Sequence, residues 1–203
     1  MAIQIIPENC GWSEKQALPP LKYSCGFCGN IVSSVIGYKV GASADGSGRQ
    51  VAAIHICPHC GGPTFIDMQG NHLPDVAFGS PVAHVPEDLN AIYNEARKCT
   101  SNSAYTAAIL LCRKTLMHIG VQQGAKEGES FLFYVNYLSD EGFVPPNGRH
   151  WVDHIRKKGN EANHEIVIME REDAKDLLLF IEMLLKFIYE FPNMVPNPSS
   201  KGG

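Results

Sequence analysis

The chain has 203 residues, of which 44% are hydrophobic and 19% charged, a composition typical of a folded, soluble protein with room for one ordinary domain and a small appendage. Its formal net charge of −4 gives no reason to expect tight, nonspecific coating of DNA or RNA. There is no apolar run of membrane-spanning length, and the first residues lack the basic start and apolar centre of a signal peptide. Seven cysteines, an odd number, suit a reducing cytoplasm better than an oxidising compartment. We therefore expect a cytoplasmic protein that does not associate with membranes.

Two Cys-x-x-Cys pairs, Cys25–Cys28 and Cys57–Cys60, are the most specific feature of the N-terminal part. Each is followed closely by glycines, which let the backbone fold around a metal ion. Two such turns supply the four soft ligands of a tetrahedral zinc site. A redox-active pair is the alternative, but a redox motif needs only one pair and usually opens a helix. The sequence therefore predicts one structural zinc ion bound by Cys25, Cys28, Cys57 and Cys60, because four thiolates leave no open position for a substrate.

The segment around these cysteines, residues 21–67, is predicted to be a zinc ribbon. Residues 31–40 are rich in β-branched side chains and read as a strand, and residues 50–56 read as a strand that leads into the second cysteine pair. The glycine-rich stretch 41–48 between them is predicted to be a hairpin tip. Such a unit has too little apolar core to fold alone, so its folding is expected to depend on metal binding.

Changes in the sequence pattern divide the chain into three regions. Residues 1–85 hold the ribbon together with extended, proline-marked connectors at 1–20 and 68–85. Residues 86–192 have a helical hydrophobic period of 3.6 and are predicted to form a bundle of about five helices. The tail, residues 193–203, is predicted to be disordered. The expected fold class is α+β, with a small N-terminal β zinc ribbon followed by an all-α helical bundle.

Helix boundaries are predicted from capping residues, glycines and prolines. The polar break Thr100–Ser103 is expected to cap the second helix, in which hydrophobic residues recur at core-facing spacing. The expected helices are Pro86–Cys99, a second helix that ends at Gly120, Ser130–Ser139, Arg149–Lys158 and Asp173–Phe191.

The last of these helices, Asp173–Phe191, is apolar almost all round and is expected to stop at Pro192. Charged residues interrupt it, and it is too short to span a membrane. It either sits centrally in its bundle or is partly covered by a second subunit. Because its polar stripe is narrow, we expect a homodimer that buries part of this helix.

A cluster of polar residues precedes that helix. Arg156, Asn160 and His164 stand four residues apart, so on a helix they would form one stripe. A cation, an amide and an imidazole together could hold a phosphodiester, because arginine binds phosphate bidentately and histidine moves a proton. A solvated helix face with a capping asparagine would have the same pattern, so the residues alone leave both interpretations open.

The Arg-x-x-Gly-Asn-x-x-x-His motif at 156–164, with the hydrophobic helix that ends in Tyr-Glu-Phe-Pro at 189–192, resembles a widespread bacterial domain-of-unknown-function family. Its members often carry an N-terminal Cys-x-x-Cys ribbon, and many are fused to or encoded beside restriction and phage-defence enzymes. That family is similar to the HEPN superfamily, helical bundles that commonly dimerise. Catalytic HEPN proteins are metal-independent ribonucleases in which Arg and His act across the dimer interface. The resemblance covers about Glu87–Pro192 and implies a HEPN-like bundle.

The resemblance also implies roles for individual residues. His164 matches the family histidine and would act as general base on an RNA 2′-hydroxyl, while Arg156 would stabilise the charge that develops on the phosphate. Asn160 matches the polar residue before the histidine. Arg113 matches an arginine of the second helix and would bind phosphate or support the site. The implied activity is an endoribonuclease acting in phage defence or as a toxin, with 2′,3′-cyclic phosphate products.

The alternative is a non-catalytic, dimerising interaction module that docks on a protein or nucleic-acid partner in a defence or regulatory system. Residues 1–85 contain four Lys or Arg residues against five acidic ones, so this ribbon lacks the basic footprint of a nucleic-acid-binding finger. The charge pattern therefore favours a structural or protein-contacting ribbon, whether or not the chain is an enzyme.

Overall fold

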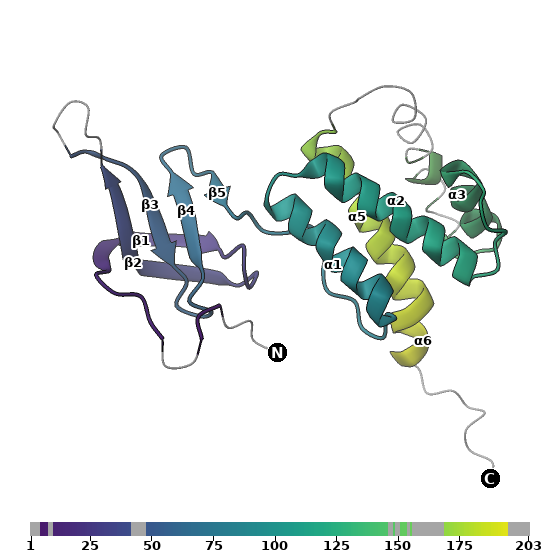
Figure 1. Ribbon diagram of the computed structural model, residues 1–203, viewed down its shortest axis with the longest axis horizontal. Helices are drawn as coiled ribbons and strands as arrows, with labels where there is room; N and C mark the ends of the chain where they lie inside the picture. The colour runs from purple at the N-terminus through teal and green to yellow at the C-terminus, as the bar shows by residue number, and fades with distance from the viewer. Residues whose placement is uncertain are drawn as a thin grey trace, which may run out of the picture. The chain divides into compact units, whose positions relative to one another are not determined.

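The structure is a computed structural model, and the protein divides into two compact units (Figure 1). The ribbon unit comprises residues 1–77 with 101–103, and the helical unit comprises residues 78–100 with 104–203. The predicted α+β class, with a β N-terminal part and a helical C-terminal part, is confirmed. The residues that the structure describes are 5–7, 10–41, 48–145, 148, 151–153, 155 and 169–194.

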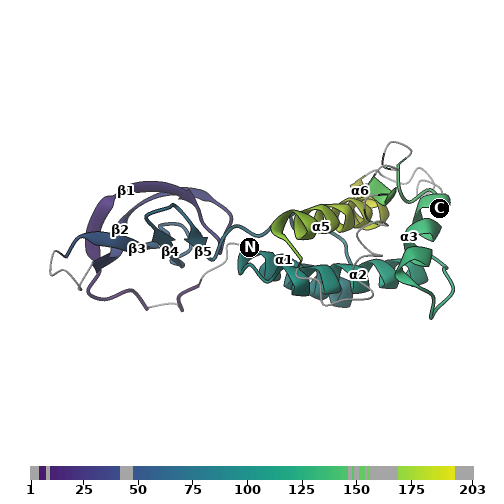
Figure 2. The same cartoon turned by 90° about the horizontal axis from the view of Figure 1, so that it is seen from above.

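The ribbon unit is built on an antiparallel sheet with strand order β1-β2-β3-β4-β5. The two strands predicted from β-branched patterning, 31–40 and 50–56, are confirmed as β2 and β3. Figure 2 shows that β1 curves over the other strands. The strands are β1 Gln16–Ser24, β2 Ile31–Gly41, β3 Gln50–Ile56, β4 Pro63–Asp67 and β5 His72–Leu73.

The prediction that residues 1–20 form an extended connector is wrong for its last part, because β1 begins at Gln16. The strand was not predicted because it contains Pro19 and Pro20, and proline cannot donate a ladder hydrogen bond. In the structure β1 is an edge strand, and its register against β2 shifts between Ala17 and Leu21, where the two prolines lie. An edge position with an irregular register tolerates proline. Likewise, β5 lies inside the connector predicted for residues 68–85.

The helical unit is formed by helices that pack around α2. This helix packs against α3 and α5. Figure 1 shows α1 and α2 side by side with α5 crossing them, and Figure 2 shows that α5 lies in a separate layer. Residues 151–153 and 155 are helical, within the helix predicted for Arg149–Lys158. No helix in the described part of the chain has the length and apolar character needed to cross a bilayer. The helices are α1 Glu87–Ser101, α2 Tyr105–Gln122, α3 Phe131–Asp140, α5 Arg171–Leu185, the π-helix η2 Lys186–Glu190 and α6 Phe191–Met194.

The core of the helical unit is centred on α5. Its apolar residues face the bundle, and Leu178, Phe180, Ile181, Leu184 and Leu185 are fully buried. The described residues therefore place this helix centrally within its own unit, the first of the two interpretations that its apolar character allowed.

Two predicted helix boundaries are wrong. The break Thr100–Ser103 does not cap the second helix: α1 continues to Ser101, and the N-cap of α2 is Ala104, which makes no side-chain cap hydrogen bond. The last helix does not stop at Pro192. The backbone N–H of Phe191 bonds to the carbonyl of Lys186, which closes the π-helix, and α6 restarts there. Pro192 thus falls in the first turn of a new helix, where a missing N–H costs nothing.

The start of α3 offers a test of local capping. The Ser130 hydroxyl accepts a hydrogen bond from the backbone N–H of Phe133 over 3.2 Å. We expect Ser130→Ala to lower the free energy of unfolding of the helical unit by about 0.5–2 kcal/mol, because that N–H loses its partner. Ser130→Gly is the matched control and should cost only a few tenths of a kcal/mol. Urea unfolding followed by far-UV circular dichroism measures both, and equal stability of Ser130→Ala and the native chain would contradict the assignment.

Candidate functional site

The four predicted metal ligands come together in the ribbon unit. The Sγ atoms of Cys25, Cys28, Cys57 and Cys60 all lie within 4.8 Å of one another. The Cys25 and Cys60 sulfurs are 3.7 Å apart, and those of Cys28 and Cys57 are 3.9 Å apart. Four sulfurs placed about 2.3 Å from a tetrahedral zinc ion would be separated by about 3.8 Å. The cluster therefore has the size that a tetrahedral thiolate site requires.

Two turns with the same backbone pattern hold these sulfurs. In the first, the Gly29 N–H bonds to the Cys25 carbonyl over 2.8 Å. In the second, the Gly61 N–H bonds to the Cys57 carbonyl over 2.9 Å. Both glycines have φ of 72°, a left-handed conformation that favours glycine. The repeated geometry explains why each Cys-x-x-Cys pair needs the glycine that follows it.

The cysteine cluster is also the core of the ribbon unit. Tyr23, Cys25, Cys57, Cys60 and Ile66 form its buried cluster, so three of the five residues are metal-ligand candidates. Burial raises the pKa of the Cys25 and Cys60 thiols. At Cys28 burial acts in the same direction, but hydrogen bonds from the backbone N–H of Asn30 and from the neighbouring thiols outweigh it and lower the pKa to about 7.

These pKa shifts bear on whether the residues fit a metal ion. Four thiols this close together, of which Cys25, Cys57 and Cys60 are buried and Cys28 is half-buried, cannot all lose their protons unless a cation compensates the negative charge. A divalent ion bound by thiolates supplies that charge and keeps the ligands deprotonated. The donor set, the distances and the burial therefore all fit a bound metal ion.

Three further side chains border the cluster, and two of them, Asn30 and Trp12, were not predicted from the sequence. The Asn30 amide lies 3.6 Å from the Cys28 sulfur and 3.1 Å from Nδ1 of His59, and so connects the two turns. The Trp12 indole donates a 2.8 Å hydrogen bond to the Gly61 carbonyl. His59 itself is exposed and is not among the clustered ligands. Only the position of Asn30, two residues after a ligand, could have suggested its role from the sequence.

The residues predicted to bind and cleave a phosphodiester are only partly covered by the described structure. Arg156, Asn160 and His164 lie outside the described residues. Arg113 is described: its guanidinium lies over the Phe131 ring, 4.3 Å from the ring centroid, and burial lowers its pKa. An arginine nonetheless stays protonated in a protein, so α2 carries a half-buried positive charge at this point.

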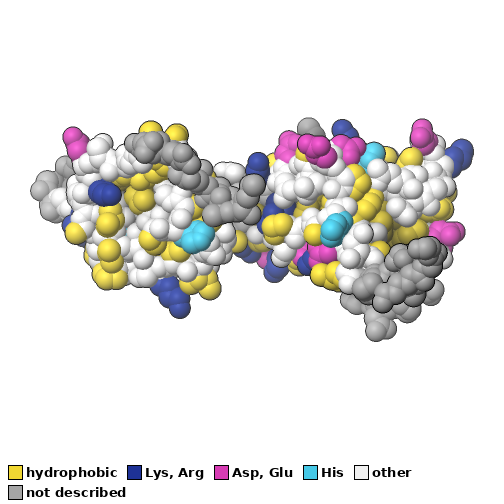
Figure 3. All heavy atoms as spheres, turned by 90° about the horizontal axis from the view of Figure 1, so that it is seen from below, with side chains coloured by type: hydrophobic (Ala, Val, Ile, Leu, Met, Phe, Trp, Pro, Cys, Tyr) yellow, Lys and Arg dark blue, Asp and Glu magenta, His cyan; other side chains and the backbone are white. Residues whose placement is uncertain are grey.

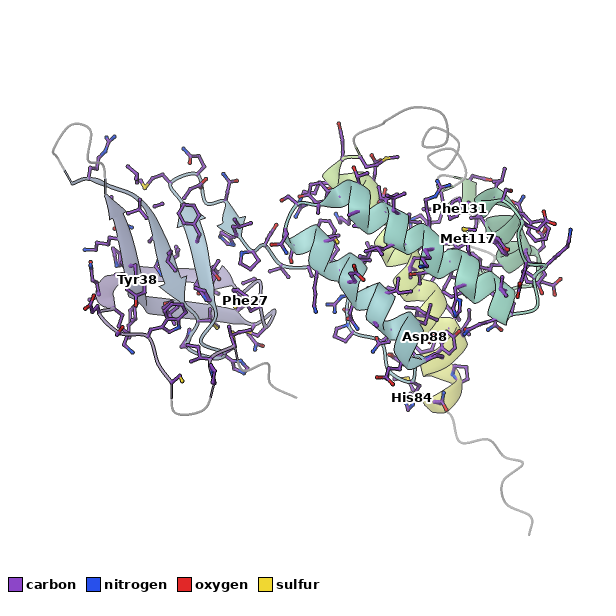
Figure 4. The ribbon with its side chains drawn as sticks, in the orientation of Figure 1. Phe27, Tyr38, His84, Asp88, Met117 and Phe131 are labelled. Atoms are coloured by element: carbon purple, nitrogen blue, oxygen red, sulfur yellow. The ribbon has the colours of Figure 1, made fainter. Side chains whose placement is uncertain are left out.

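Arg113 lines a surface groove of about 570 Å³, called here the α2 groove. Met117 on α2 and Phe131 at the start of α3, which lies under Arg113, occupy the same side of the helical unit (Figure 4). The groove was not predicted from the sequence. Its lining includes Leu110, Arg113, Lys114, Met117, His118 and Val121 of α2.

A second surface feature lies on the ribbon sheet. Tyr38 pairs with Ile54, Ile54 with Phe65, and Phe65 with Leu73, so the four side chains occupy one row on one face of the sheet. Phe65 is 38% exposed and Leu73 is 53% exposed. We call these four residues the apolar row. The adjacent row on the opposite face, which includes His55 and Thr64, is buried.

Comparison with known proteins identifies the helical part of the chain. Residues 94–199, more than half of the chain, match the model of a domain of unknown function, DUF4145. Neither curated proteins nor solved structures give a match. The matched segment starts within α1, contains α2, α3 and α5, and extends past α6. The chain is therefore a member of the DUF4145 family.

Proposed function

We propose that the protein is an interaction module, in which a zinc-stabilised ribbon and a HEPN-like helical bundle bind other proteins. The apolar row is the observation that carries this proposal. It crosses four strands, about 14 Å at the usual strand spacing, and presents two exposed apolar side chains, Phe65 and Leu73, beside half-buried Tyr38 and Ile54. Contiguous exposed apolar surface of this kind is typical of protein-binding sites.

The charge of the ribbon unit supports a protein partner over a nucleic acid. Four Lys or Arg residues stand against five acidic residues in positions 1–85, so a phosphate backbone would find no excess of cations. Figure 3 shows hydrophobic side chains at the surface of this unit with few charged side chains among them. Many members of the family that the chain resembles are fused to or encoded beside restriction and phage-defence enzymes, which favours a defence-system protein as the partner.

The metal site supports a structural role for zinc in this proposal. Zinc is the metal that four clustered cysteine thiolates of this size most often bind. With Cys25, Cys28, Cys57 and Cys60 as ligands, the coordination sphere is full, and no position remains for a substrate or an activated water. The ion would then hold the sheet that displays the apolar row.

The proposal is tested by affinity capture from the source cells with quantitative mass spectrometry. The double variant Phe65→Ser/Leu73→Ser should lose at least one protein that the native chain captures, because polar side chains interrupt the row. Ile31→Ser is the matched control, since Ile31 is 69% exposed on the same sheet but is not in the row. Each lost protein is then purified and titrated against both variants. Equal binding to all three chains would reject the proposal.

A second candidate function is an endoribonuclease, which the resemblance of the 156–164 motif to catalytic HEPN proteins supports. The matched segment, residues 94–199, contains Arg113 together with Arg156, Asn160 and His164. In this proposal His164 removes the proton of an RNA 2′-hydroxyl, Arg156 stabilises the phosphate, Asn160 orients the pair, and Arg113 supports the site.

Incubation of the purified protein with total RNA and tRNA in EDTA tests this candidate. Cleavage to 2′,3′-cyclic phosphate ends is expected, and His164→Ala should reduce its rate by about 10²–10⁴-fold, the usual contribution of a general base. Absence of cleavage by the native chain, or equal cleavage by His164→Ala, would reject it.

A homodimer remains a prediction for this module. α5 buries most of its apolar residues in its own unit, but a hollow of about 270 Å³ remains along its other side, lined by residues that include Leu179, Met183 and Phe187. Phe187 is 44% exposed. We expect light scattering at micromolar concentration to give a dimer, and Phe187→Glu to give a monomer because it places a charge in the interface. A native chain that is monomeric under these conditions would contradict the prediction.

A further inference from the structure

The α2 groove is an elongated apolar trough. Leu110, Met117 and Val121 line it along one side of α2, and Ile92 of α1 and Tyr134 of α3 complete the apolar lining. Leu110 is 62% exposed, although it lies on a helix whose neighbouring residues form the core. Eleven residues separate Leu110 from Val121, a distance of about 16 Å along the helix axis. The trough is therefore as long as about three turns of a second helix.

The walls of the groove determine which backbone conformation can occupy it. Apart from Glu127, they are formed by side chains of helices, whose backbone groups already bond within each helix. An extended peptide would leave its own backbone donors and acceptors without partners against such an apolar wall, whereas a helix satisfies them internally. The groove thus suits a helix with apolar residues at helical spacing.

The charge of α2 determines the complementary charge of that helix. Within Tyr105–Gln122 there is no acidic residue, but Arg113 and Lys114 are present, and both line the groove. Lys114 is exposed, while Arg113 is held over the Phe131 ring. Glu127 is the acidic residue of the lining and follows the C-terminal end of α2. This local positive charge, in a chain of net charge −4, would attract carboxylates placed beside the apolar residues of an incoming helix.

Among the helices that the structure describes, a second copy of the chain supplies no such helix. The helices that begin with acidic residues are α1, with Glu87 and Asp88, and α5, with Glu172 and Asp173. Both direct most of their apolar residues into the bundle, where Leu89, Tyr93 and Leu178 are fully buried. Either helix would have to leave its own core before it could enter a neighbour's groove.

We propose that the α2 groove binds an acidic amphipathic α-helix of a partner protein. Its apolar residues, at positions i, i+3 or i+4, and i+7, lie against the apolar side of α2 between Leu110 and Val121, and its carboxylates lie opposite Arg113 and Lys114. This inference deepens the proposed interaction function and rests on it, but it concerns a different surface from the apolar row, so the two can fail separately.

The test uses two pools of displayed helical peptides of about 16 residues, the length that fills the groove with short ends. Both pools carry apolar residues at i, i+3 or i+4, and i+7. The other positions are drawn from Glu, Gln and Ala in one pool and from Lys, Gln and Ala in the other. The full-length, metal-loaded protein is the bait, beside Leu110→Glu, Lys114→Glu and, as the matched control, Ile31→Glu on the ribbon unit. Circular dichroism confirms that every bait is folded.

The native chain and Ile31→Glu should enrich the Glu pool. Leu110→Glu should abolish enrichment, and Lys114→Glu should weaken the preference for the Glu pool by about fivefold, the effect of one exposed ion pair. Phe65→Ser/Leu73→Ser should bind the selected peptides as the native chain does, which separates this result from the test of the apolar row. Absence of enrichment, preference for the Lys pool, or insensitivity to Leu110→Glu would overturn the proposal. A native dimer that Leu110→Glu converts to a monomer would also overturn it, because a second copy would then be the occupant.

Discussion

Removal of the metal ion is expected to unfold the ribbon unit and to leave the helical unit intact. Among the described residues, the buried cluster of the ribbon consists of Cys25, Cys57 and Cys60 with Tyr23 and Ile66, and the hydrophobic residues packed against it are only partly buried, so little apolar core remains without the ion. Binding of structural zinc contributes about 10–16 kcal/mol in small zinc domains. Helices α1, α2 and α5 have a separate core of aliphatic and aromatic residues, which contains none of the four ligands.

Hydrogen exchange measured by mass spectrometry checks this result. After chelation at neutral pH, amides of β1–β4 should exchange rapidly, whereas those of α2 and α5 should stay protected. Cys60→Ser should have the same effect without a chelator, and elemental analysis should find one zinc ion per native chain. Cys10→Ser is the matched control, because Cys10 is exposed and lies outside the cluster. Protected ribbon amides in the Cys60→Ser chain would contradict a structural role for the metal.

The pH dependence of the site follows from its chemistry. Thiolates bind the metal only after they lose their protons, and burial raises the pKa of Cys25 and Cys60 in the metal-free cluster. Metal affinity, and with it the stability of the ribbon unit, should therefore fall as the pH falls. The helical unit contains no such site among its described residues and should not share this dependence.

Leu116→Ala is expected to destabilise the helical unit strongly. Leu116 is fully buried in the core of the helical unit, within the helix that packs against α3 and α5. Removal of its side chain leaves a cavity between these helices, and such changes cost about 2–5 kcal/mol. Leu110→Ala removes the same atoms from the same helix, but that side chain is 62% exposed. We expect its cost to stay within about 0.5 kcal/mol, as for surface substitutions in general.

Urea unfolding followed by far-UV circular dichroism compares the two variants, because α-helices dominate that signal. A chain with two units need not unfold in one step, so the comparison uses the transition that the native helical unit shows. Leu116→Ala should shift this transition to lower urea without a change in slope. Similar urea midpoints for Leu116→Ala and Leu110→Ala would contradict the assignment of Leu116 to the core and of Leu110 to the surface of α2.

The position of the metal cluster could be predicted because its information is local. Each Cys-x-x-Cys pair forms one turn, and its spacing with the following glycine is enough to direct two sulfurs to one point. The helix start at Ser130 is equally local, since one hydroxyl meets an N–H three residues later. Hydrophobic spacing likewise predicted the buried side of α2, which includes Ala108, Cys112 and Leu116.

Other features depend on partners that are distant in the sequence. β1 contains two prolines, which are unfavourable in a strand. They are tolerated because β1 lies at the edge of the sheet and its register against β2 is irregular. The helix after Arg171 passes Pro192 because a π-helical segment shifts the hydrogen-bond ladder just before it. Of the four residues predicted to bind or cleave a phosphodiester, only Arg113 lies in the described part of the structure. That Arg113, Arg156, Asn160 and His164 lie close together stays a prediction.

The sequence by itself determined the two units, their classes and the four cysteines of the metal site, because turns, caps and periodic patterns act over a few residues. Only the tertiary structure decided which apolar side chains reach the surface. The apolar row depends on the register of four strands, and the α2 groove depends on how α1 and α3 flank one helix. Leu110 and Leu116 have the same chemistry and lie on the same helix, yet one is exposed and the other is buried. The difference arises because other helices cover one side of α2 and leave another side exposed. The helical period of the hydrophobic residues does not by itself show how many sides of a helix other helices will cover.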